Sequence, residues 1–249
     1  MIVAIDIGNT SIHVGLFSHG RLRRRVSLPT TLAHRAAKLG RRIWFRGADE
    51  AIICSVVPRV TPGVVRALRA AGCRRVRVVG RHLRVPLKNR YRSPRQVGQD
   101  RLVGAYAAWK AYKRDCIVAD FGTAITLDIV TKAGEYLGGI IAPGLEIALE
   151  ALATRTALLP KVELKEPPEL LGRDTANSIR SGILYGCAAL CDGLVTQLKR
   201  RYAPRATVVA TGGASPLIAK HASTIDHLKP HLVLDGLYQL SLPSLRTPR

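Results

Sequence analysis

Short apolar runs interrupted by a glycine turn occur in both halves of this 249-residue chain. Residues 2–6 and 12–17 are two such runs on either side of a turn, and this pattern predicts a β-hairpin. Residues 116–130 repeat the pattern, with an apolar run, a turn that contains glycine and a second apolar run. The chain therefore has the same predicted strand–turn–strand unit near its start and near its middle.

The two turns carry the same polar residues. Asp6 and Gly8 in the first hairpin are matched by Asp120 and Gly122 in the second, both at an offset of 114 residues. This spacing is close to half the chain length and indicates an internal duplication. We therefore expect an α/β fold with two similar domains, each of which begins with a strand–turn–strand.

Between and after the hairpins, strands and helices alternate. Short apolar runs predict buried strands at residues 51–57, 76–79 and 208–211. Helical stripes and caps predict helices at residues 61–71, 96–113, 144–158 and 175–202, with Thr61 as the cap of the first and Pro62 in its first turn. No low-complexity linker separates the halves, so we expect domains 1–114 and 115–249, packed around a cleft.

Composition excludes several classes of protein. No segment approaches the ~18 uninterrupted apolar residues of a membrane span, and no signal peptide precedes the first predicted strand. The sequence thus predicts a cytoplasmic protein without a membrane partner. Five scattered cysteines are spaced neither as a zinc site nor as a disulfide framework, so we expect reduced and mostly buried thiols.

The net charge of +22 is distributed unevenly, with +18 in residues 1–101. Arginine runs at 21–25 and 73–77 raise the hypothesis of nucleic-acid binding. Aromatic residues are sparse and are not interleaved with the basic ones, and no zinc-finger, RNA-recognition or basic-zipper signature is present. The pattern argues against specific nucleic-acid binding and favours a solvated basic surface that attracts anionic substrates.

Two Asp-x-Gly turns on a cleft suit a nucleoside triphosphate, although one alone is usually an ordinary hairpin turn. Glycine lets backbone N–H groups approach phosphate oxygens, and Thr10 and Thr123 add hydroxyl donors. A carboxylate at a strand end can hold a cation that bridges to phosphate. The turn pattern thus predicts Asp6 as an organiser of Mg²⁺ and Asp120 as a second cation ligand. A glycine pair at 212–213 offers a flat surface for adenine or ribose.

Residues 91–101 place an acid and a base at the start of a predicted helix, where Gly98 precedes Asp100 and Arg101. Phosphorylation of a hydroxyl calls for a carboxylate that takes its proton, and Asp100 is the best candidate. Arg101 could bind a substrate carboxylate with its planar fork. The alternative is that Asp100 is a helix-start residue paired with Arg101 or Arg95.

Seven short motifs occur in order along nearly the whole chain. They are Asp6-Ile-Gly-Asn-Thr10, Tyr91-x-Ser-Pro94, Gly98-x-Asp-Arg101, Asp120-Phe-Gly-Thr-Ala124, Tyr136-Leu-Gly-Gly-x-Ile-x-Pro-Gly144, Thr175-x-x-Ser-Ile179 and Thr211-Gly-Gly213. Together they resemble the type III pantothenate kinases, which belong to the group of acetate, sugar and heat-shock ATPases with actin-like folds.

The resemblance implies two duplicated actin-like (ribonuclease H-like) domains, with mixed sheets flanked by helices and an ATP cleft between them. It implies ATP-dependent phosphorylation of pantothenate to 4′-phosphopantothenate, the first step of coenzyme A synthesis. It further implies a homodimer, Mg²⁺ as the divalent ion with ATP, and K⁺ or NH₄⁺ as a monovalent cofactor.

The resemblance also implies a role for each matching position. Asp100 is similar to the proton acceptor and Thr123 to an ATP contact. Asp120 is similar to the monovalent-cation ligand, which replaces the divalent role that the turn pattern alone predicts. The implied pantothenate contacts are Tyr91, Gly98, Gln99, Asp100, Arg101 and, near the dimer interface, Thr175. The implied first phosphate-binding element is Asp6, Ile7, Gly8, Asn9, Thr10, Ser11, Ile12 and His13.

One position departs from the family pattern. The first turn usually continues to a lysine that reaches the ATP phosphates, and here that position is His13. A neutral imidazole has one donor and a shorter reach, and it is cationic only at lower pH. We therefore expect weaker ATP binding, or activity that falls more steeply as pH rises. Gln99 also stands at a position that is usually small.

Three hypotheses follow. The first is an active pantothenate kinase. The second is a catalytically weak member with a regulatory or nucleic-acid-associated role, motivated by the basic N-terminal half and by His13. The third is a kinase for another small acid alcohol on the same scaffold, with residues 91–101 as the recognition segment.

Overall fold

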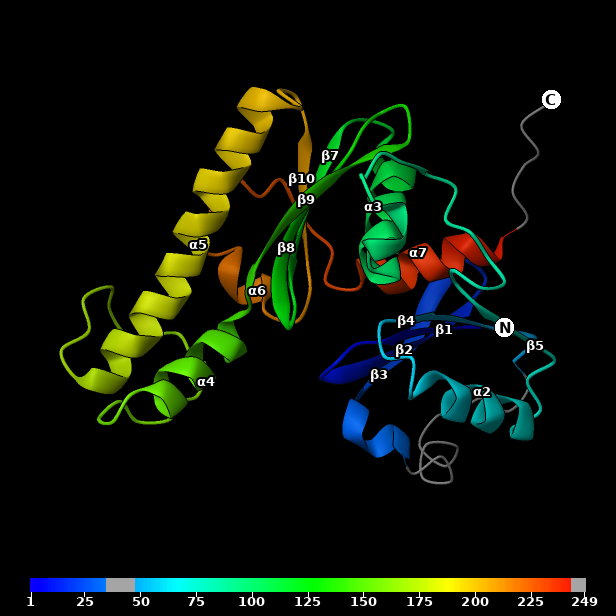
Figure 1. Ribbon diagram of the computed structural model, residues 1–249, viewed down its shortest axis with the longest axis horizontal. Coiled ribbons are helices and arrows are strands. Elements are labelled where there is room, and N and C mark those ends of the chain that lie inside the picture. The colour runs from blue at the N-terminus through cyan, green and yellow to red at the C-terminus, as the bar shows by residue number, and fades with distance from the viewer. Residues whose placement is uncertain (35–47, 243–249) are drawn as a thin grey trace. The chain divides into compact units, whose positions relative to one another are not determined.

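The computed structural model describes residues 1–34 and 48–242, and it divides the chain into two compact units (Figure 1). Unit 1 contains the described residues of 1–87, 92–107 and 232–249, and unit 2 contains 88–91 and 108–231. The expected domains 1–114 and 115–249 differ from these units mainly at the end of the chain. The last helix returns to unit 1 because its apolar side packs on the first sheet.

Unit 1 is built on a mixed five-stranded sheet in the order β3-β2-β1-β4-β5. The central strand β1 pairs antiparallel with β2 and parallel with β4. The strands are β1 (Ile2–Ile7), β2 (Ser11–Ser18), β3 (Arg21–Pro29), β4 (Glu50–Ser55) and β5 (Arg75–Val78). The helices are η1 (Thr30–His34), α2 (Thr61–Ala70), η2 (Pro94–Gln96), α7 (Leu232–Ser241) and the N-terminal part of α3 (Gln99–Tyr112).

Alternating side chains of β1 cover both faces of this sheet. Val3 packs with the buried residues of α2, whereas Ala4 packs with Val103 of α3 and Leu237 of α7. Because side chains alternate along a strand, Asp6 lies on the same face as Ala4. The carboxylate at the end of β1 is therefore on the side of the sheet that α3 covers.

Unit 2 repeats this architecture. Its six-stranded sheet has the order β11-β10-β7-β8-β9-β6, with β7 antiparallel to β8 and parallel to β10. Apart from β6, each strand corresponds in position to one strand of unit 1, which confirms the duplication. The strands are β6 (Lys88–Asn89), β7 (Cys116–Phe121), β8 (Ala124–Val130), β9 (Glu135–Pro143), β10 (Thr207–Thr211) and β11 (His227–Leu228). The helices are α4 (Leu145–Arg155), α5 (Thr175–Arg201) and α6 (Ser215–Ile218).

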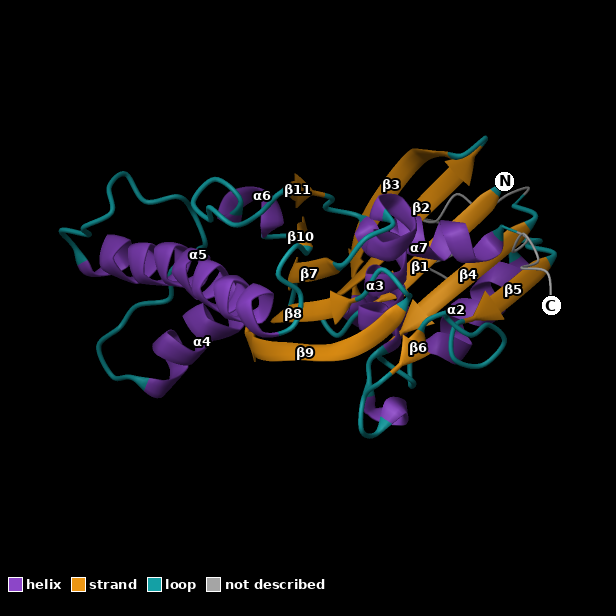
Figure 2. Ribbon diagram, turned by 90° about the horizontal axis from the view of Figure 1, so that it is seen from above, coloured by secondary structure: helices purple, strands orange, loops and turns teal. Residues whose placement is uncertain are grey.

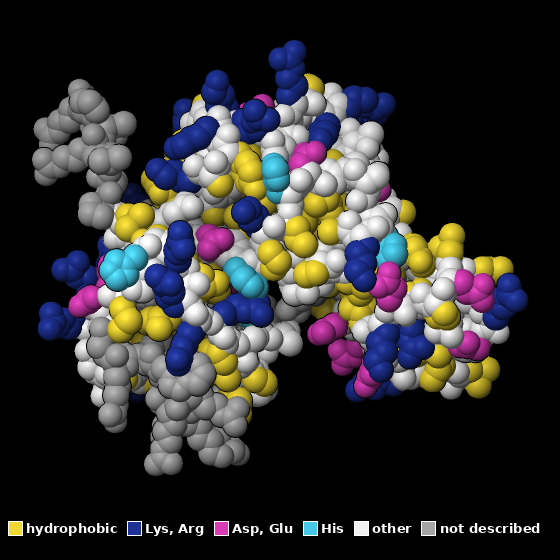
Figure 3. Space-filling view, turned by 180° about the vertical axis from the view of Figure 1, so that it is seen from behind, with side chains coloured by type: hydrophobic (Ala, Val, Ile, Leu, Met, Phe, Trp, Pro, Cys, Tyr) yellow, Lys and Arg dark blue, Asp and Glu magenta, His cyan; other side chains and the backbone are white. Residues whose placement is uncertain are grey.

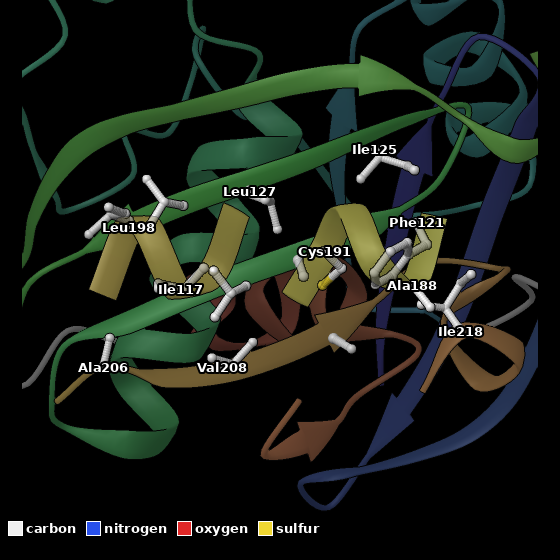
Figure 4. Packing of buried hydrophobic residues seen from close by; sticks show 14 of the residues in the cluster. Ile117, Phe121, Ile125, Leu127, Ala188, Cys191, Leu198, Ala206, Val208 and Ile218 are labelled. Atoms are coloured by element: carbon white, nitrogen blue, oxygen red, sulfur yellow. The ribbon is translucent and has the colours of Figure 1, made fainter. Parts of the chain in front are cut away.

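The core of unit 2 lies between its sheet and α5 (Figure 4). Ile117 and Phe121 of β7 and Leu127 of β8 pack with Cys191 and Leu198 of α5. The opposite face of the same strands carries Asp120, Thr126 and Asp128, by alternation. Strand β9 runs beside β8 and extends this sheet (Figure 2).

Two local predictions were wrong. The cap of α2 is Val60, which makes no side-chain capping bond. The Thr61 hydroxyl instead donates to the Val57 carbonyl and to the Ser55 hydroxyl. The helix expected at 96–113 begins at Gln99, because Pro94–Gln96 form a 3₁₀ turn and Val97 is extended.

The cysteine prediction is confirmed. All five thiols are unpaired, and four of them are buried, namely Cys54, Cys73, Cys116 and Cys191. Burial raises the pKa of the Cys191 thiol to about 11, with a further rise from the charge of Asp192. The described helices include none with the length and apolar character needed to cross a bilayer.

Candidate functional site

The first turn lies at the carboxyl end of β1 in unit 1. The Gly8 N–H donates to the Ser11 carbonyl at 2.9 Å, and the Gly8 carbonyl accepts from the Thr30 hydroxyl at 2.7 Å. A Cβ on Gly8 would stand 3.1 Å from the Ser11 carbonyl oxygen, so the tight turn favours glycine. Asn9 and Thr10 are exposed at its tip, where their side chains can meet a ligand.

Asp6 lies between two neighbours on adjacent strands. It is directly opposite His13 in the antiparallel ladder with β2, and in register with Cys54 of β4. Side chains directly opposite in such a ladder share a face, with Cβ atoms about 4.5–5.5 Å apart. The imidazole at the position of the expected lysine is thus adjacent to the strand-end carboxylate.

The start of α3 lies next to the end of β1, because a Cβ on Gly98 would lie 3.8 Å from Val56 Cγ1 and the Val56 N–H donates to the Ile7 carbonyl at 3.1 Å. The pKa of Cys54 is raised well above its usual value, first by burial and then by the negative charges of Asp6 and Asp100. Asp100 is the second residue of α3 and is half-buried. Unit 1 therefore brings together two of the residues that the sequence singles out for phosphoryl transfer, at one end of the sheet.

Gly98 allows Asp100 to take its position. A Cβ on Gly98 would lie 2.4 Å from Asp100 Oδ1, so any other residue would push this carboxylate away. The same oxygen accepts the Arg101 N–H at 2.8 Å, within the first turn of the helix. The Gln99 side chain, expected at the substrate, packs against Gly80 at the end of β5. The first turn of α3 thus holds the Asp100 carboxylate in one orientation. The Gln99 side chain points instead to the end of β5.

The second turn has the same position in unit 2. Asp120 stands opposite Thr126 in the β7–β8 ladder and in register with Thr211 of the parallel strand β10. Glycines surround its carboxylate: a Cβ on Gly122 would lie 3.3 Å from Asp120 Oδ1, and one on Gly212 only 2.3 Å from it. Gly122 and Gly212 therefore pack against the carboxylate, a contact that the sequence did not reveal.

The strand pairing in the two hairpins shows where the duplicated turns differ in length. Asp6 pairs with His13, seven residues later, whereas Asp120 pairs with Thr126, six residues later. The second turn is therefore one residue shorter than the first, and the structural counterpart of His13 is Thr126. Thr123 is exposed at this shorter turn, and its carbonyl contacts Gly144, which precedes α4.

Tyr91 follows the short strand β6 in unit 2. Its N–H donates to Asn89 Oδ1 at 3.0 Å, and its ring lies against Gly138, where an added Cβ would meet it at 3.4 Å. Gly138 has φ +127°, a conformation that side chains rarely adopt. The Tyr91 ring thus lies on the backbone of β9 at Gly138, where no side chain intervenes, and we call this contact the Tyr91 platform.

Thr175 is exposed on the first turn of α5 and lies far from Tyr91 within one chain. The C-terminal part of α5 packs on the start of β7, with Leu198 near Ile117 (Figure 4). This end of the sheet also carries the start of β9 and the Tyr91 platform. Thr175 lies about 35 Å from Leu198 along the axis of α5, at a rise of 1.5 Å per residue. A single chain therefore does not bring these two expected pantothenate contacts together.

Among residues 1–34 and 48–242, no three His, Cys, Asp or Glu side chains come together in a way that could hold a metal ion. Asp6 offers one carboxylate, which fits a Mg²⁺ ion that takes its other ligands from phosphates and water. At Asp120, the space that a Gly212 side chain would fill is bounded by Asp120 Oδ1 and the Phe121 carbonyl oxygen. Such a set of oxygens suits a hard cation.

The arginine runs have a structural position that explains them. Residues 21–25 belong to β3 and residues 75–77 to β5, which are the two edges of the first sheet. Charged side chains on edge strands prevent pairing with other chains. On the face in Figure 3, Lys and Arg side chains are spread among apolar and acidic ones. This arrangement does not favour a nucleic-acid role.

Comparisons with known proteins agree with this geometry. The family model described as type III pantothenate kinase matches residues 2–197. A protein named type III pantothenate kinase 1 from Symbiobacterium thermophilum is 41% identical and covers 98% of each chain.

Solved structures of lower identity share the fold. A Campylobacter jejuni protein named for the Baf family of transcriptional activators has a TM-score of 0.60 at 17% identity, over 96% of each chain. The inorganic polyphosphate/ATP-glucomannokinase of Arthrobacter sp. strain KM has a TM-score of 0.51 at 15% identity, over 96% of this chain and 98% of that one. The expected actin-like α/β fold with two mixed sheets is confirmed.

Proposed function

We propose that this chain, which belongs to the type III pantothenate kinase family, transfers the γ-phosphoryl group of ATP to the hydroxyl of pantothenate. The observation that carries the proposal is that Gly98, two residues before Asp100, lies against Val56, whose N–H donates to the carbonyl of Ile7, the neighbour of Asp6. This proximity supports a site in which a phosphate-binding turn and a proton-accepting carboxylate act together at one end of the sheet of unit 1. The product is 4′-phosphopantothenate, and we place the enzyme in the cytoplasm.

Asp100 acts as the proton acceptor in this proposal. Phosphoryl transfer has a loose transition state, so catalysis depends on positioning the hydroxyl and on stabilising charge. A carboxylate that accepts a hydrogen bond from the hydroxyl orients it and takes its proton as the bond to phosphorus forms. The Arg101 N–H donates to Asp100 Oδ1 and so orients the carboxylate for this role.

Each unit carries one of the two Asp-x-Gly turns that this proposal assigns to ATP and its cations. In unit 1, Gly8 through Thr10 present the turn to the phosphates, and Asp6 supplies a carboxylate for Mg²⁺, which neutralises phosphate charge. In unit 2, Thr123 contributes a hydroxyl, and Asp120 binds K⁺ or NH₄⁺ with backbone oxygens. The dense glycine packing around Asp120 supports its role as a fixed cation ligand.

A homodimer completes the pantothenate site. Thr175 is far from Tyr91 within one chain, so in this proposal it reaches the site of a second subunit. Large apolar side chains are exposed near the start of α5, which supports an interface there. They are Ile147, Leu158, Leu170 and Leu171.

A direct assay tests the proposed function. ATP consumption is measured with and without pantothenate, in K⁺ buffer and in Na⁺ buffer at equal ionic strength. We expect turnover that requires pantothenate and is faster in K⁺. Turnover without pantothenate, or only with another acid alcohol, would contradict the substrate assignment. No turnover, together with tight and salt-sensitive DNA binding, would favour the regulatory alternative.

His13→Lys should lower the KM for ATP by about threefold to tenfold, which corresponds to about 0.7–1.4 kcal/mol. The longer cationic side chain reaches the phosphates and replaces a weaker imidazole contact. The KM for pantothenate serves as the internal control and should stay within about twofold. A KM for ATP that His13→Lys leaves unchanged at every pH from 6 to 8 would reject a role for His13 in phosphate binding.

Mixing two inactive variants should restore activity if Thr175 acts across the dimer. Asp100→Asn removes the base, and Thr175→Arg blocks the contact that the subunit donates. Co-refolded subunits form heterodimers in which one site has both intact residues, so about a quarter of wild-type activity should return. The same mixture without subunit exchange is the control. Activity that never exceeds the sum of the two variants would place Thr175 outside the partner's site.

A further inference from the structure

Asp128 is a buried carboxylate that the proposed reaction does not use. It lies on β8, is 1% exposed, and shares the sheet face of Asp120. Two hydroxyls donate to it: Tyr136 to Oδ1 at 2.6 Å and Thr126 to Oδ2 at 3.1 Å. Burying a carboxylate is costly unless hydrogen bonds compensate, and these two hydroxyls supply two of them.

Tyr136 connects this carboxylate to the expected substrate segment. Its side chain is fully buried on β9, and its ring centroid lies 6.5 Å from that of Tyr91, with the planes tilted by 43°. Tyr91 lies over the bare backbone of Gly138, two residues further along the same strand. The position of the Tyr136 ring therefore bounds the space available to Tyr91.

Charged residues anchor the backbone before Tyr91 to the same strand. Strand β6 pairs with the start of β9, where Asn89 stands opposite Tyr136. Glu135 pairs with Arg90 at 2.5 Å and with Lys88 at 3.3 Å. These contacts are partly exposed and contribute little on their own. These ion pairs hold the backbone, whereas the Tyr91 ring itself contacts Gly138 and neighbours the buried ring of Tyr136.

We propose that Asp128 is a positioning residue for pantothenate binding, which acts by fixing the Tyr136 hydroxyl and, through the Tyr136 ring, the orientation of Tyr91. The inference rests on the proposed function, because it takes Tyr91 as a pantothenate contact. The carboxylate has a definite advantage over an apolar residue here. It accepts both hydroxyls at once and so holds the Tyr136 hydroxyl in one position.

Tyr136→Phe is the central test, because it removes only the hydroxyl and keeps the ring. The KM for pantothenate should rise about threefold to tenfold, while kcat and the KM for ATP stay within about twofold. The pantothenate-induced rise in melting temperature should shrink by a corresponding amount, which gives a readout independent of turnover. Asp128→Ala removes both acceptor oxygens and should show the same pattern.

A double variant, with both Asp128 and Tyr136 substituted, distinguishes positioning from general destabilisation. If Asp128 acts through Tyr136, the double variant should have the KM of the more affected single variant, whereas independent effects would multiply. Tyr112→Phe is the matched control: its hydroxyl is also buried in unit 2 but has no hydrogen-bond partner in the described part of the chain. It should leave every kinetic constant unchanged.

The outcomes separate the two proposals. Wild-type protein without pantothenate-dependent turnover would reject the proposed function. An active wild type with an unchanged KM for pantothenate in Tyr136→Phe would overturn only the present inference. Variants that lower the melting temperature but not the affinity for pantothenate would reduce Asp128 to a stabilising core residue, and would overturn it as well. If Asp128→Ala fails to fold, Tyr136→Phe alone decides.

Discussion

Asp100→Asn should lower kcat by about 10²–10⁴-fold, the range that a positioned general base contributes. The amide has nearly the shape of the carboxylate and can still accept the Arg101 N–H, so the helix start should be preserved. It cannot take the proton of the attacking hydroxyl. The dissociation constant for ATP and the melting temperature should therefore remain close to those of the wild type, while turnover is lost.

Asp49→Asn is a suitable control for this substitution. Asp49 is an exposed carboxylate that pairs with the amino terminus, at the start of β1 rather than at its end. It should leave kcat within about twofold. Asp100→Asn protein that keeps more than a tenth of the wild-type kcat would exclude Asp100 as the base, and Asp100 would then be a helix-start residue only.

Gly212→Ala should destabilise the protein by about 2–4 kcal/mol and abolish stimulation by K⁺. Gly212 has φ +90°, which strains any other residue, and an added Cβ would meet Asp120 Oδ1 at 2.3 Å and the Phe121 carbonyl carbon at 2.6 Å. The backbone of β7 and β10 can shift only at the expense of their ladder, so the carboxylate must move. Urea unfolding and the K⁺ dependence of turnover measure the two effects.

Gly213→Ala provides the matched comparison one residue later. No atom lies within 4 Å of a Cβ on Gly213, so this substitution should change the free energy of unfolding by less than about 0.5 kcal/mol. K⁺ stimulation should persist. If Gly212→Ala keeps both its stability and its K⁺ response, Asp120 does not depend on this glycine, and the cation site must be sought elsewhere.

The sequence could predict much of the fold because the duplication is visible in apolar runs and turn residues. It could not predict β3, because arginines at an exposed edge hide the apolar alternation that predicts a strand. Strand β9 is obscured by Gly138 and Gly139. The return of α7 to unit 1 depends on packing between residues far apart in the chain, which local patterns do not contain.

The candidate site was predicted in part for the same reason. The pairing of Asp6 with His13 follows from a hairpin and is accessible to sequence reasoning. The contacts of Gly212 with Asp120 and of Tyr136 with Asp128 depend on strand order and register, including a bulge between Ile129 and Val130. A one-residue change of register would move these side chains to the other face, so residue spacing alone cannot specify them.

The most direct test of the central claim is identification of the phosphorylated product. The purified protein is incubated with ATP, Mg²⁺, K⁺ and pantothenate, and the products are analysed by mass spectrometry alongside Asp100→Asn. We predict one phosphopantothenate formed for each ADP, with product formation reduced at least a hundredfold in the variant. ADP formed without phosphopantothenate, or equal product from the wild type and the variant, would contradict the account.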